Sequence, residues 1–128
     1  DYGNFSIWHP ESDLYIMDLT TGTTKNLENV NSSDVDSYHT WSSSGHWFVF
    51  SSKRMDGLWA RPYIAAFNPE TGETGKAFLL PQEDPMFYDN YTYTYNRPEL
   101  IKTAVKNGKE FEKIIQQAAI PSTPKKNH

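Results

Sequence analysis

The chain has 128 residues, which is enough for one domain of ordinary size but not for two independent cores. It has no cysteine, which excludes disulfides, thiolate-ligated metals and thiol catalysis, and no apolar run approaches the roughly 20 residues that span a bilayer. Residues 1–96 carry 13 acidic and 5 basic side chains, a balance that argues against a nucleic acid partner, whereas residues 97–128 carry 3 and 7. Because Leu, Ile, Val and Phe supply only 25 residues, the 8 Tyr and 4 Trp must help to form the core, and aromatic side chains favour sheet.

A β-hairpin is predicted near the N-terminus. Leu14–Leu19 is apolar on nearly all sides, the pattern of a strand that lies between two layers. Thr20–Thr23 predicts a turn, because Gly22 can adopt a positive φ without steric cost, and Thr24–Leu27 predicts the returning strand. Residues 29–37 are polar and rich in Ser and Asp, which indicates a loop.

A four-stranded antiparallel meander is predicted next. Short β-rich runs alternate with turn-forming clusters of Gly, Ser, Asn and Pro. The second run carries Phe48 and Phe50 on one face and Trp47 and Val49 on the other, so both faces of the sheet require burial. The expected strands are 38–42, 47–52, 59–67 and 76–80, the last ended by Pro81.

The hairpin and the meander share a sequence pattern. Leu14–Leu19 with Gly22 matches Pro62–Phe67 with Gly72 at an offset of 48 residues, which the second turn lengthens to 50. A period of about 40–50 residues with four strands per unit is typical of β-propeller blades, which pack face to face. We therefore expect an all-β fold of antiparallel four-stranded propeller-blade units, about one and a half in number. The expected units are an incomplete blade at residues 4–28 and a full blade at residues 38–81.

Residues 82–120 are predicted to form a helical cap or extension. Asp84 followed by Pro85 is a helix-start signal, because the carboxylate can accept from the first-turn N–H groups and Pro is favoured as the first helical residue. The residues that then share one helical face are Phe87, Tyr88, Tyr91 and Tyr95. The alternative is a strand in which every second residue of Tyr91–Tyr95 is a tyrosine on one face, but the cap favours the helix.

Two further elements are expected towards the C-terminus. Residues 100–105 fit a short strand, and residues 109–119 fit an amphipathic helix after a turn at Asn107-Gly108. The basic charge of this region fits a solvated helix face or, alternatively, an interaction arm. Residues 121–128 are expected to be a disordered tail.

A turn-and-strand motif identifies a related family. Trp41-Ser42-Ser43-Ser44-Gly45 followed by Phe48–Arg54 resembles the motif of TolB-like, WD-repeat-like β-propellers, commonly Trp-Ser-Pro-Asp-Gly, an apolar strand and a Ser-Asp-Arg turn. Asp13–Leu19, with Gly22 and Leu27, is similar to the strands that follow in that family, so the resemblance covers about residues 4–81. Ser43-Ser44 replaces the Pro-Asp pair, which should loosen the turn, and residues 84–128 have no counterpart in a blade.

The resemblance implies a non-catalytic protein-interaction scaffold within a larger bacterial propeller protein of the periplasm or cell envelope. Because closed propellers have at least about four blades, we expect the chain to be the C-terminal part of such a protein, able to self-associate through exposed blade faces. The resemblance leaves the protein partner unidentified. The alternatives are a propeller domain accessory to a hydrolase of the prolyl-oligopeptidase type, and a glycan-binding module that uses exposed Trp and Tyr.

No catalytic residues are predicted. A hydrolase needs a Gly-x-Ser-x-Gly nucleophile elbow, which the sequence lacks, so Ser42–Ser44 are interpreted as turn residues. Asp34, Asp36 and His39 have the donor types of a cation site, but the glycine-punctuated spacing of a calcium loop is missing. We therefore predict no metal and no cofactor, and interpret His39 and His46 as packing or surface residues.

The candidate binding residues are Trp59, Arg61 and Tyr63. They alternate along one predicted strand, and Trp, Arg and Tyr are enriched at binding hot spots. The alternative is packing within the sheet, with a cation–π pair between a guanidinium and a ring. If the binding hypothesis holds, Trp59→Ala or Arg61→Ala should weaken partner capture without lowering stability.

Overall fold

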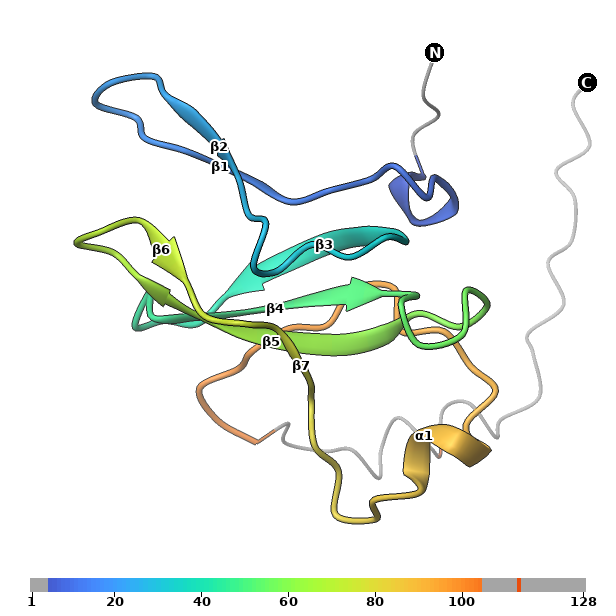
Figure 1. Cartoon of the computed structure of the whole chain (residues 1–128). Coiled ribbons are helices and arrows are strands. Elements are labelled where there is room, and N and C mark those ends of the chain that lie inside the picture. Colours follow the sequence, from blue (N-terminus) through green and yellow to red (C-terminus); the bar gives the residue numbers. More distant parts are fainter. Residues whose placement is uncertain (1–4, 105–112, 114–128) are drawn as a thin grey trace, which may run out of the picture.

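Antiparallel strands make up most of the regular structure of the chain (Figure 1). The computed structural model describes residues 5–104 and residue 113, and all strand pairs in this part are antiparallel, as the all-β prediction requires. The elements are η1 (Ser6–Trp8), β1 (Tyr15–Met17), β2 (Thr24–Asn26), β3 (Asp36–Trp41), β4 (Trp47–Ser52), β5 (Arg61–Asn68), β6 (Glu73–Thr74), β7 (Phe78–Leu79) and α1 (Phe87–Asn90).

The larger sheet is the predicted meander, with strand order β3, β4 and β5 and with β6 and β7 along the outer edge of β5. A step of three residues along β5, from Ile64 to Phe67, is matched by a step of four on the outer edge, from Phe78 back to Thr74. β6 and β7 are therefore two pieces of one strand that an extra residue interrupts, which is the definition of a bulge. The predicted fourth strand at 76–80 is thus split and begins earlier, and the predicted third strand starts at Arg61 rather than at Trp59.

The opposite edge strand, β3, also contains a bulge. It begins at Asp36, inside the segment predicted as a loop, and its register against β4 shifts between Ser37 and Thr40. Tyr38 has a φ of +54° there, the only positive value at a non-glycine residue in the part of the chain described. Bulges accept such a conformation because one residue leaves the ladder.

The β1–β2 hairpin forms a second layer over one face of the sheet (Figure 1). From the hairpin segment, Leu14, Leu27 and Val30 are buried against β4 and β5. The sheet contributes Phe48, Phe50, Tyr63 and Ala65 to the same core. We call this side of the sheet the hairpin face. Its rings form a continuous row, with 5.9 Å between the centroids of Phe48 and Phe50 and 6.1 Å between those of Phe50 and Tyr63.

The two predicted repeat segments end in the same turn. Asp18 accepts hydrogen bonds from the N–H groups of Thr20 and Thr21, and Asn68 accepts them from the N–H groups of the two residues at the same relative positions. Gly22 (φ +71°) and Gly72 (φ +69°) close the two turns in the conformation that glycine adopts without a Cβ clash. The hydrogen bonds therefore repeat at a constant offset of 50, so the offset of 48 predicted for the strands is wrong by two residues.

The motif turn between β3 and β4 is closed by serine hydroxyls. The Ser42 and Ser44 hydroxyl oxygens lie 3.0 Å apart, and Trp47 N–H donates to the Ser42 hydroxyl over 3.2 Å. Backbone bonds between Ser42 and Trp47 (2.8 Å) and between Gly45 and Ser42 (3.0 Å) complete the turn. The expected loosening through loss of the Pro-Asp pair is therefore compensated by side chains that the sequence itself supplies.

The segment after Pro81 differs most from its prediction. Asp84 does accept a hydrogen bond from Met86 N–H (2.9 Å), but the helix that follows, α1, ends at Asn90. Residues 91–104 form neither the predicted continuation of the helix nor the predicted strand at 100–105, as far as the latter is described. Instead they form an irregular strap along the second face of the sheet, the strap face. The predicted helix at 109–119 lies outside the described residues except for residue 113, and the predicted tail at 121–128 lies outside them entirely.

The strap is attached to the sheet through its backbone. The Ser51 hydroxyl donates to the carbonyl oxygens of Tyr95 and Asn96, and Tyr95 N–H donates to Ala60 O over 3.0 Å. Further along the strap, the Arg97 guanidinium lies 5.3 Å from the centre of the Tyr38 ring. The bulge in β3 thus holds a ring that the strap contacts. The two sheets remain separate within the described residues and do not close around an axis.

Candidate functional site

The three predicted binding residues do not form one exposed ladder. Trp59 precedes β5 and is 36% exposed, whereas Arg61 and Tyr63 lie in β5 and are 3% and 8% exposed. Tyr63 faces the hairpin, and the cation that covers its ring is Arg54, at 4.6 Å from the ring centre. Trp59 is therefore the member of the set that a partner can reach, and the binding role of the three residues stays a prediction.

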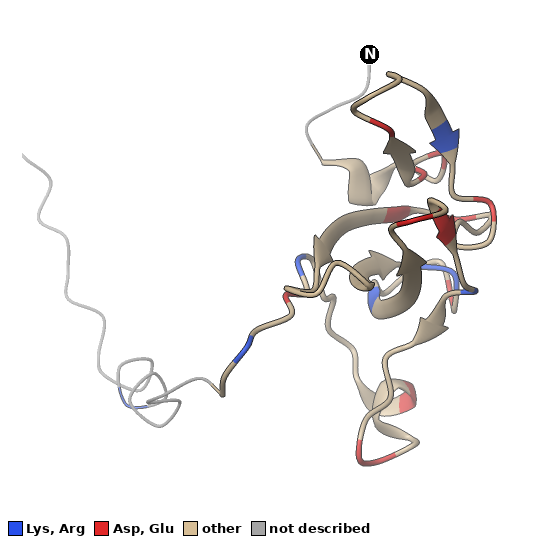
Figure 2. Cartoon of the chain, turned by 90° about the vertical axis from the view of Figure 1, so that its left-hand side faces the viewer, with Lys and Arg blue, Asp and Glu red and all other residues tan. Residues whose placement is uncertain are grey.

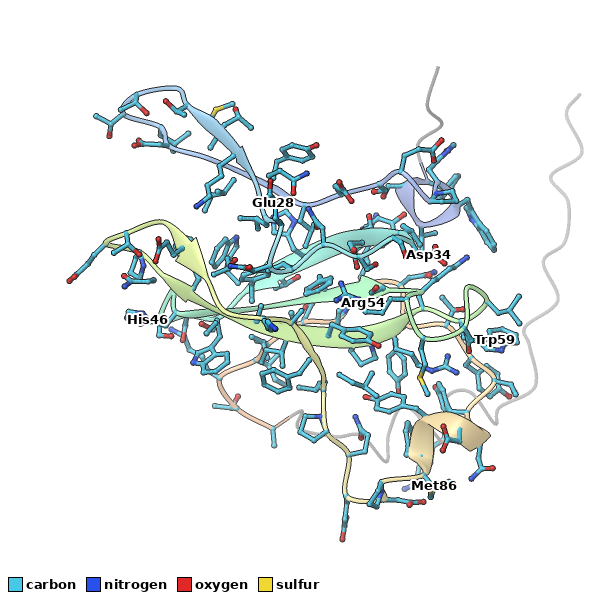
Figure 3. All side chains as sticks on the ribbon, in the orientation of Figure 1. Glu28, Asp34, His46, Arg54, Trp59 and Met86 are labelled. Carbon is cyan, nitrogen blue, oxygen red and sulfur yellow. The ribbon has the colours of Figure 1, made fainter. Side chains whose placement is uncertain are left out.

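Trp59 belongs to a surface of large apolar side chains at one end of the sheet. Figure 3 shows it at the end of the molecule that lies away from the two hairpin turns. Met55 and Leu58, from the same β4–β5 connection, are 46% and 69% exposed, and Trp8 of η1 is 71% exposed. Lys53 lies with its ammonium group 4.1 Å from the centre of the Trp8 ring, which joins η1 to this connection. We call Trp8, Met55, Leu58 and Trp59 the loop surface.

The carboxylate of Asp56 holds the loop surface in shape. One of its oxygens accepts hydrogen bonds from the N–H groups of Leu58 (2.8 Å) and Trp59 (2.9 Å), and the other lies 3.4 Å from the guanidinium of Arg61. Partial burial opposes the ionisation of Asp56, but the two N–H donors and the charges of Arg61 and Lys53 outweigh it and lower the pKa of the carboxyl below its ordinary value of 3.8. The charged form of Asp56 is therefore part of the loop structure at neutral pH.

Arg61 connects the loop surface to the strap. Its guanidinium donates to the backbone oxygens of Tyr88 (3.2 Å) and Tyr93 (3.4 Å) in addition to its pairing with Asp56. The Nε atom is buried without a hydrogen-bond partner among the described residues. Because Arg61 is buried and anchors three segments, Arg61→Ala is expected to lower stability, so it cannot separate binding from folding. Trp59 can serve for that purpose.

A buried ion pair between Asp36 and Arg54 is a feature that sequence reasoning missed. The two side chains meet at 2.6 Å between the sheet and the hairpin layer, where the Asp36 side chain is fully buried and that of Arg54 is 19% exposed. Arg54 also donates to Val30 O (2.6 Å) and Ser52 Oγ (2.8 Å), and the second Asp36 oxygen accepts from Ser32 N–H (2.6 Å). Asp36 follows a polar segment that looks like a loop in the sequence, and its partner lies 18 residues away, so no local signal links them.

The strap contributes a cluster of aromatic rings. Tyr91 stacks on Phe87 (4.9 Å between ring centres) and on Tyr95 (5.2 Å), and Tyr88 is only 4% exposed. The Tyr88 hydroxyl donates to Leu80 O and accepts from Gln82. Burial, a hydrogen bond with Tyr91 and the neighbouring phenols raise the pKa of Tyr95 to about 12. These residues pack among themselves in a mixture of short helix and extended chain. Neither the helical nor the strand periodicity considered for the sequence therefore fits them.

Two of the three residues considered for metal binding have other roles. Asp36 is paired with Arg54, and one carboxylate oxygen of Asp34 accepts a hydrogen bond from Val35 N–H over 2.7 Å. Within residues 5–104 and 113, no three His, Asp or Glu side chains are placed to share an ion. Charged residues of both signs are spread over loops and strand ends (Figure 2).

The site that the structure offers is therefore a preorganised apolar surface. No helix in the described part of the chain is both long and apolar enough to cross a membrane. Comparison with known proteins adds no further assignment, because no family model, no curated protein and no solved structure matches this chain.

Proposed function

We propose that this chain is a non-catalytic protein-interaction scaffold and that it forms part of a TolB-like β-propeller of a bacterial periplasm or cell envelope. The propeller assignment is supported by the antiparallel meander, by the serine-closed turn at the family motif and by the turn that repeats at an offset of 50. The location is carried by the sequence resemblance alone.

The loop surface carries the binding part of the proposal. Its three β4–β5 residues are large, apolar and exposed, and the backbone of Leu58 and Trp59 is held by Asp56. A surface that is already ordered loses little conformational entropy on binding, which favours affinity. Trp is the residue type most enriched among interface hot spots. The partner is therefore expected to be a protein that supplies an apolar pocket.

The test is photo-cross-linking in cells with a benzophenone amino acid at position 59, followed by titration of the cross-linked protein with the purified chain. Trp59→Ala should weaken that binding by roughly 30-fold or more, the effect of a hot-spot residue of about 2 kcal/mol. The matched control is Trp41→Ala, because Trp41 is exposed to a similar degree (37%) but lies outside the loop surface. Equal losses in the two variants, or no cross-linked protein at position 59, would contradict the proposal.

A further inference from the structure

The strap face of the sheet carries an apolar groove of about 510 Å³. Phe78 of β7 is 48% exposed there, and Ile101 of the strap is 59% exposed. The remaining apolar lining comes from Trp47, Ile64, Leu80, Pro81 and Leu100, with Lys102 at the same site. Exposed apolar area of this kind is typical of surfaces that receive another protein segment.

The groove has an equivalent elsewhere in the chain, and there the equivalent residues are covered. In the hairpin, Leu14 and Leu27 lie opposite each other, with Leu27 N–H donating to Leu14 O over 3.1 Å, and both are buried against the hairpin face of the sheet. At the offset of 50, Leu14 corresponds to Ile64. The residue opposite Ile64 is Phe78, one position beyond the strict equivalent of Leu27 because of the bulge. The pair Ile64–Phe78 is thus the repeat of an apolar pair that is covered elsewhere in the same molecule.

The complementary surface is also present and uncovered. Tyr15 and Met17 point away from the sheet on the outer side of the hairpin and are 59% and 55% exposed. At the offset of 50 they correspond to Ala65 and Phe67, which belong to the hairpin face that the first pair covers. Leu19, in the turn that follows, is 90% exposed. Within the chain, the inner side of the hairpin packs on the hairpin face of the sheet. The chain therefore exposes a second copy of each of these two surfaces.

We propose that the groove beside Ile64 and Phe78 binds the outer hairpin surface of a second copy of this chain, so that copies associate head to tail. The two surfaces lie on different sides of the molecule, which makes the interface heterologous and lets each copy bind one neighbour on each side. The internal contact between Leu14, Leu27 and the hairpin face is the template for this interface. The inference rests on the propeller architecture of the proposed function, but it concerns surfaces other than the loop surface.

Sedimentation velocity of the whole chain tests this proposal. We expect the mean sedimentation coefficient to rise with concentration beyond that of a dimer, because each added copy leaves two free surfaces. Phe78→Asp in the groove and Met17→Asp on the hairpin should each weaken the association by at least roughly tenfold, since a charge is placed in an apolar contact. The matched controls are Phe5→Asp and Met86→Asp, which change residues of the same types with 65% and 56% exposure outside both surfaces.

Mixing the two variants gives the decisive result. Phe78→Asp keeps an intact hairpin surface and Met17→Asp keeps an intact groove, so an equimolar mixture should form a one-to-one dimer and nothing larger. A wild-type chain that remains monomeric up to submillimolar concentration overturns the proposal. So does association that the two variants retain, or that mixing fails to restore while circular dichroism shows both variants folded. These readouts are independent of partner capture at Trp59, so the failure of one proposal is distinguishable from the failure of the other.

Discussion

The two faces of the main sheet are covered in different ways. The hairpin face is filled by interlocking side chains, with Phe48 and Phe50 at most 1% exposed and a fully buried carboxylate neutralised by Arg54. The strap face is covered by irregular chain that is attached through backbone atoms and leaves a groove beside Phe78. Alternation along β4 supplies apolar residues to both faces equally. The difference therefore comes from the segment that packs on each face, which is the hairpin on one side and the strap on the other. Cooperative stability is therefore expected to depend mainly on the hairpin face.

Neighbouring substitutions on β4 give the largest test of this comparison. Phe50→Ala should lower the free energy of unfolding by about 3–5 kcal/mol, because a fully buried ring is lost and a cavity remains. Val49→Ala, on the strap face and also 1% exposed, removes only two methyl groups and should cost about 2 kcal/mol or less. Urea denaturation measures both values. Because Phe50→Ala removes a phenyl ring and Val49→Ala only two methyl groups, the two faces are compared by the cost per removed carbon atom. An equal cost per carbon would mean that the two faces contribute alike.

The buried ion pair gives the next largest effect. Asp36→Ala should lower the free energy of unfolding by about 3 kcal/mol, because it leaves the charge of Arg54 without its partner in a mostly buried position. The double variant Asp36→Ala/Arg54→Met should recover part of this loss, since the unpaired charge is then removed. Urea denaturation of the two variants checks the prediction, and a double variant that is no more stable than Asp36→Ala would contradict it.

Removing the hydroxyl of Ser51 should affect only the strap. Ser51→Ala should cost about 1 kcal/mol through the lost hydrogen bonds to the carbonyl oxygens of Tyr95 and Asn96. Hydrogen exchange should accelerate at the Tyr95 amide, which donates to Ala60 O, and stay unchanged in the β1–β2 hairpin. Faster exchange in the hairpin would show that the two faces are more tightly coupled than their contacts indicate.

The smallest effect at neutral pH is expected at the phenol of Tyr95. Its pKa is raised from 10.0 to about 12 in the folded chain, so the stabilisation is complete below pH 10.0 and is lost as the pH rises towards about 12. Burial also raises the pKa of Tyr63 and of Tyr88, so tyrosinate absorbance should show a late-ionising group of tyrosines, and Tyr95→Phe should lower its amplitude by one phenol. An unchanged late amplitude in this variant would contradict the assignment of Tyr95 to this group.

The sequence predicts the meander because its strands are bounded by Gly, Asn and Pro turns and carry aromatic residues at alternate positions. It misses the bulges at Tyr38 and between Thr74 and Phe78, because an extra residue in an edge strand changes pairing without changing local composition. The helix after Asp84 fails for a different reason. Asp84 does accept a hydrogen bond from Met86 N–H, but this bond closes a turn before α1, whose N-cap is Met86 without a side-chain hydrogen bond. Tyr91 and Tyr95 then pack on each other, and such tertiary contacts override helix propensity.

For the candidate site, the sequence identifies Trp59 but groups it with Arg61 and Tyr63, which are buried. Arg61 and Tyr63 share its period of two, yet the strand begins only at Arg61, so the periodicity does not extend to the tryptophan. Leu58 and Trp8 carry no motif and are identified as part of the surface only through their exposure. Exposure depends on which segments cover the loop, and that information is absent from local sequence.

The two bulges have a consequence for how the protein can meet other chains. Both outer strands of the main sheet are interrupted, β3 at Tyr38 and the opposite edge between β6 and β7. A foreign strand would therefore find only short stretches of regularly spaced N–H and C=O groups, and interrupted edges of this kind discourage the addition of strands that leads to amyloid-like ladders. Growth along the hydrogen-bonding direction is thus disfavoured, while contact across the faces remains open.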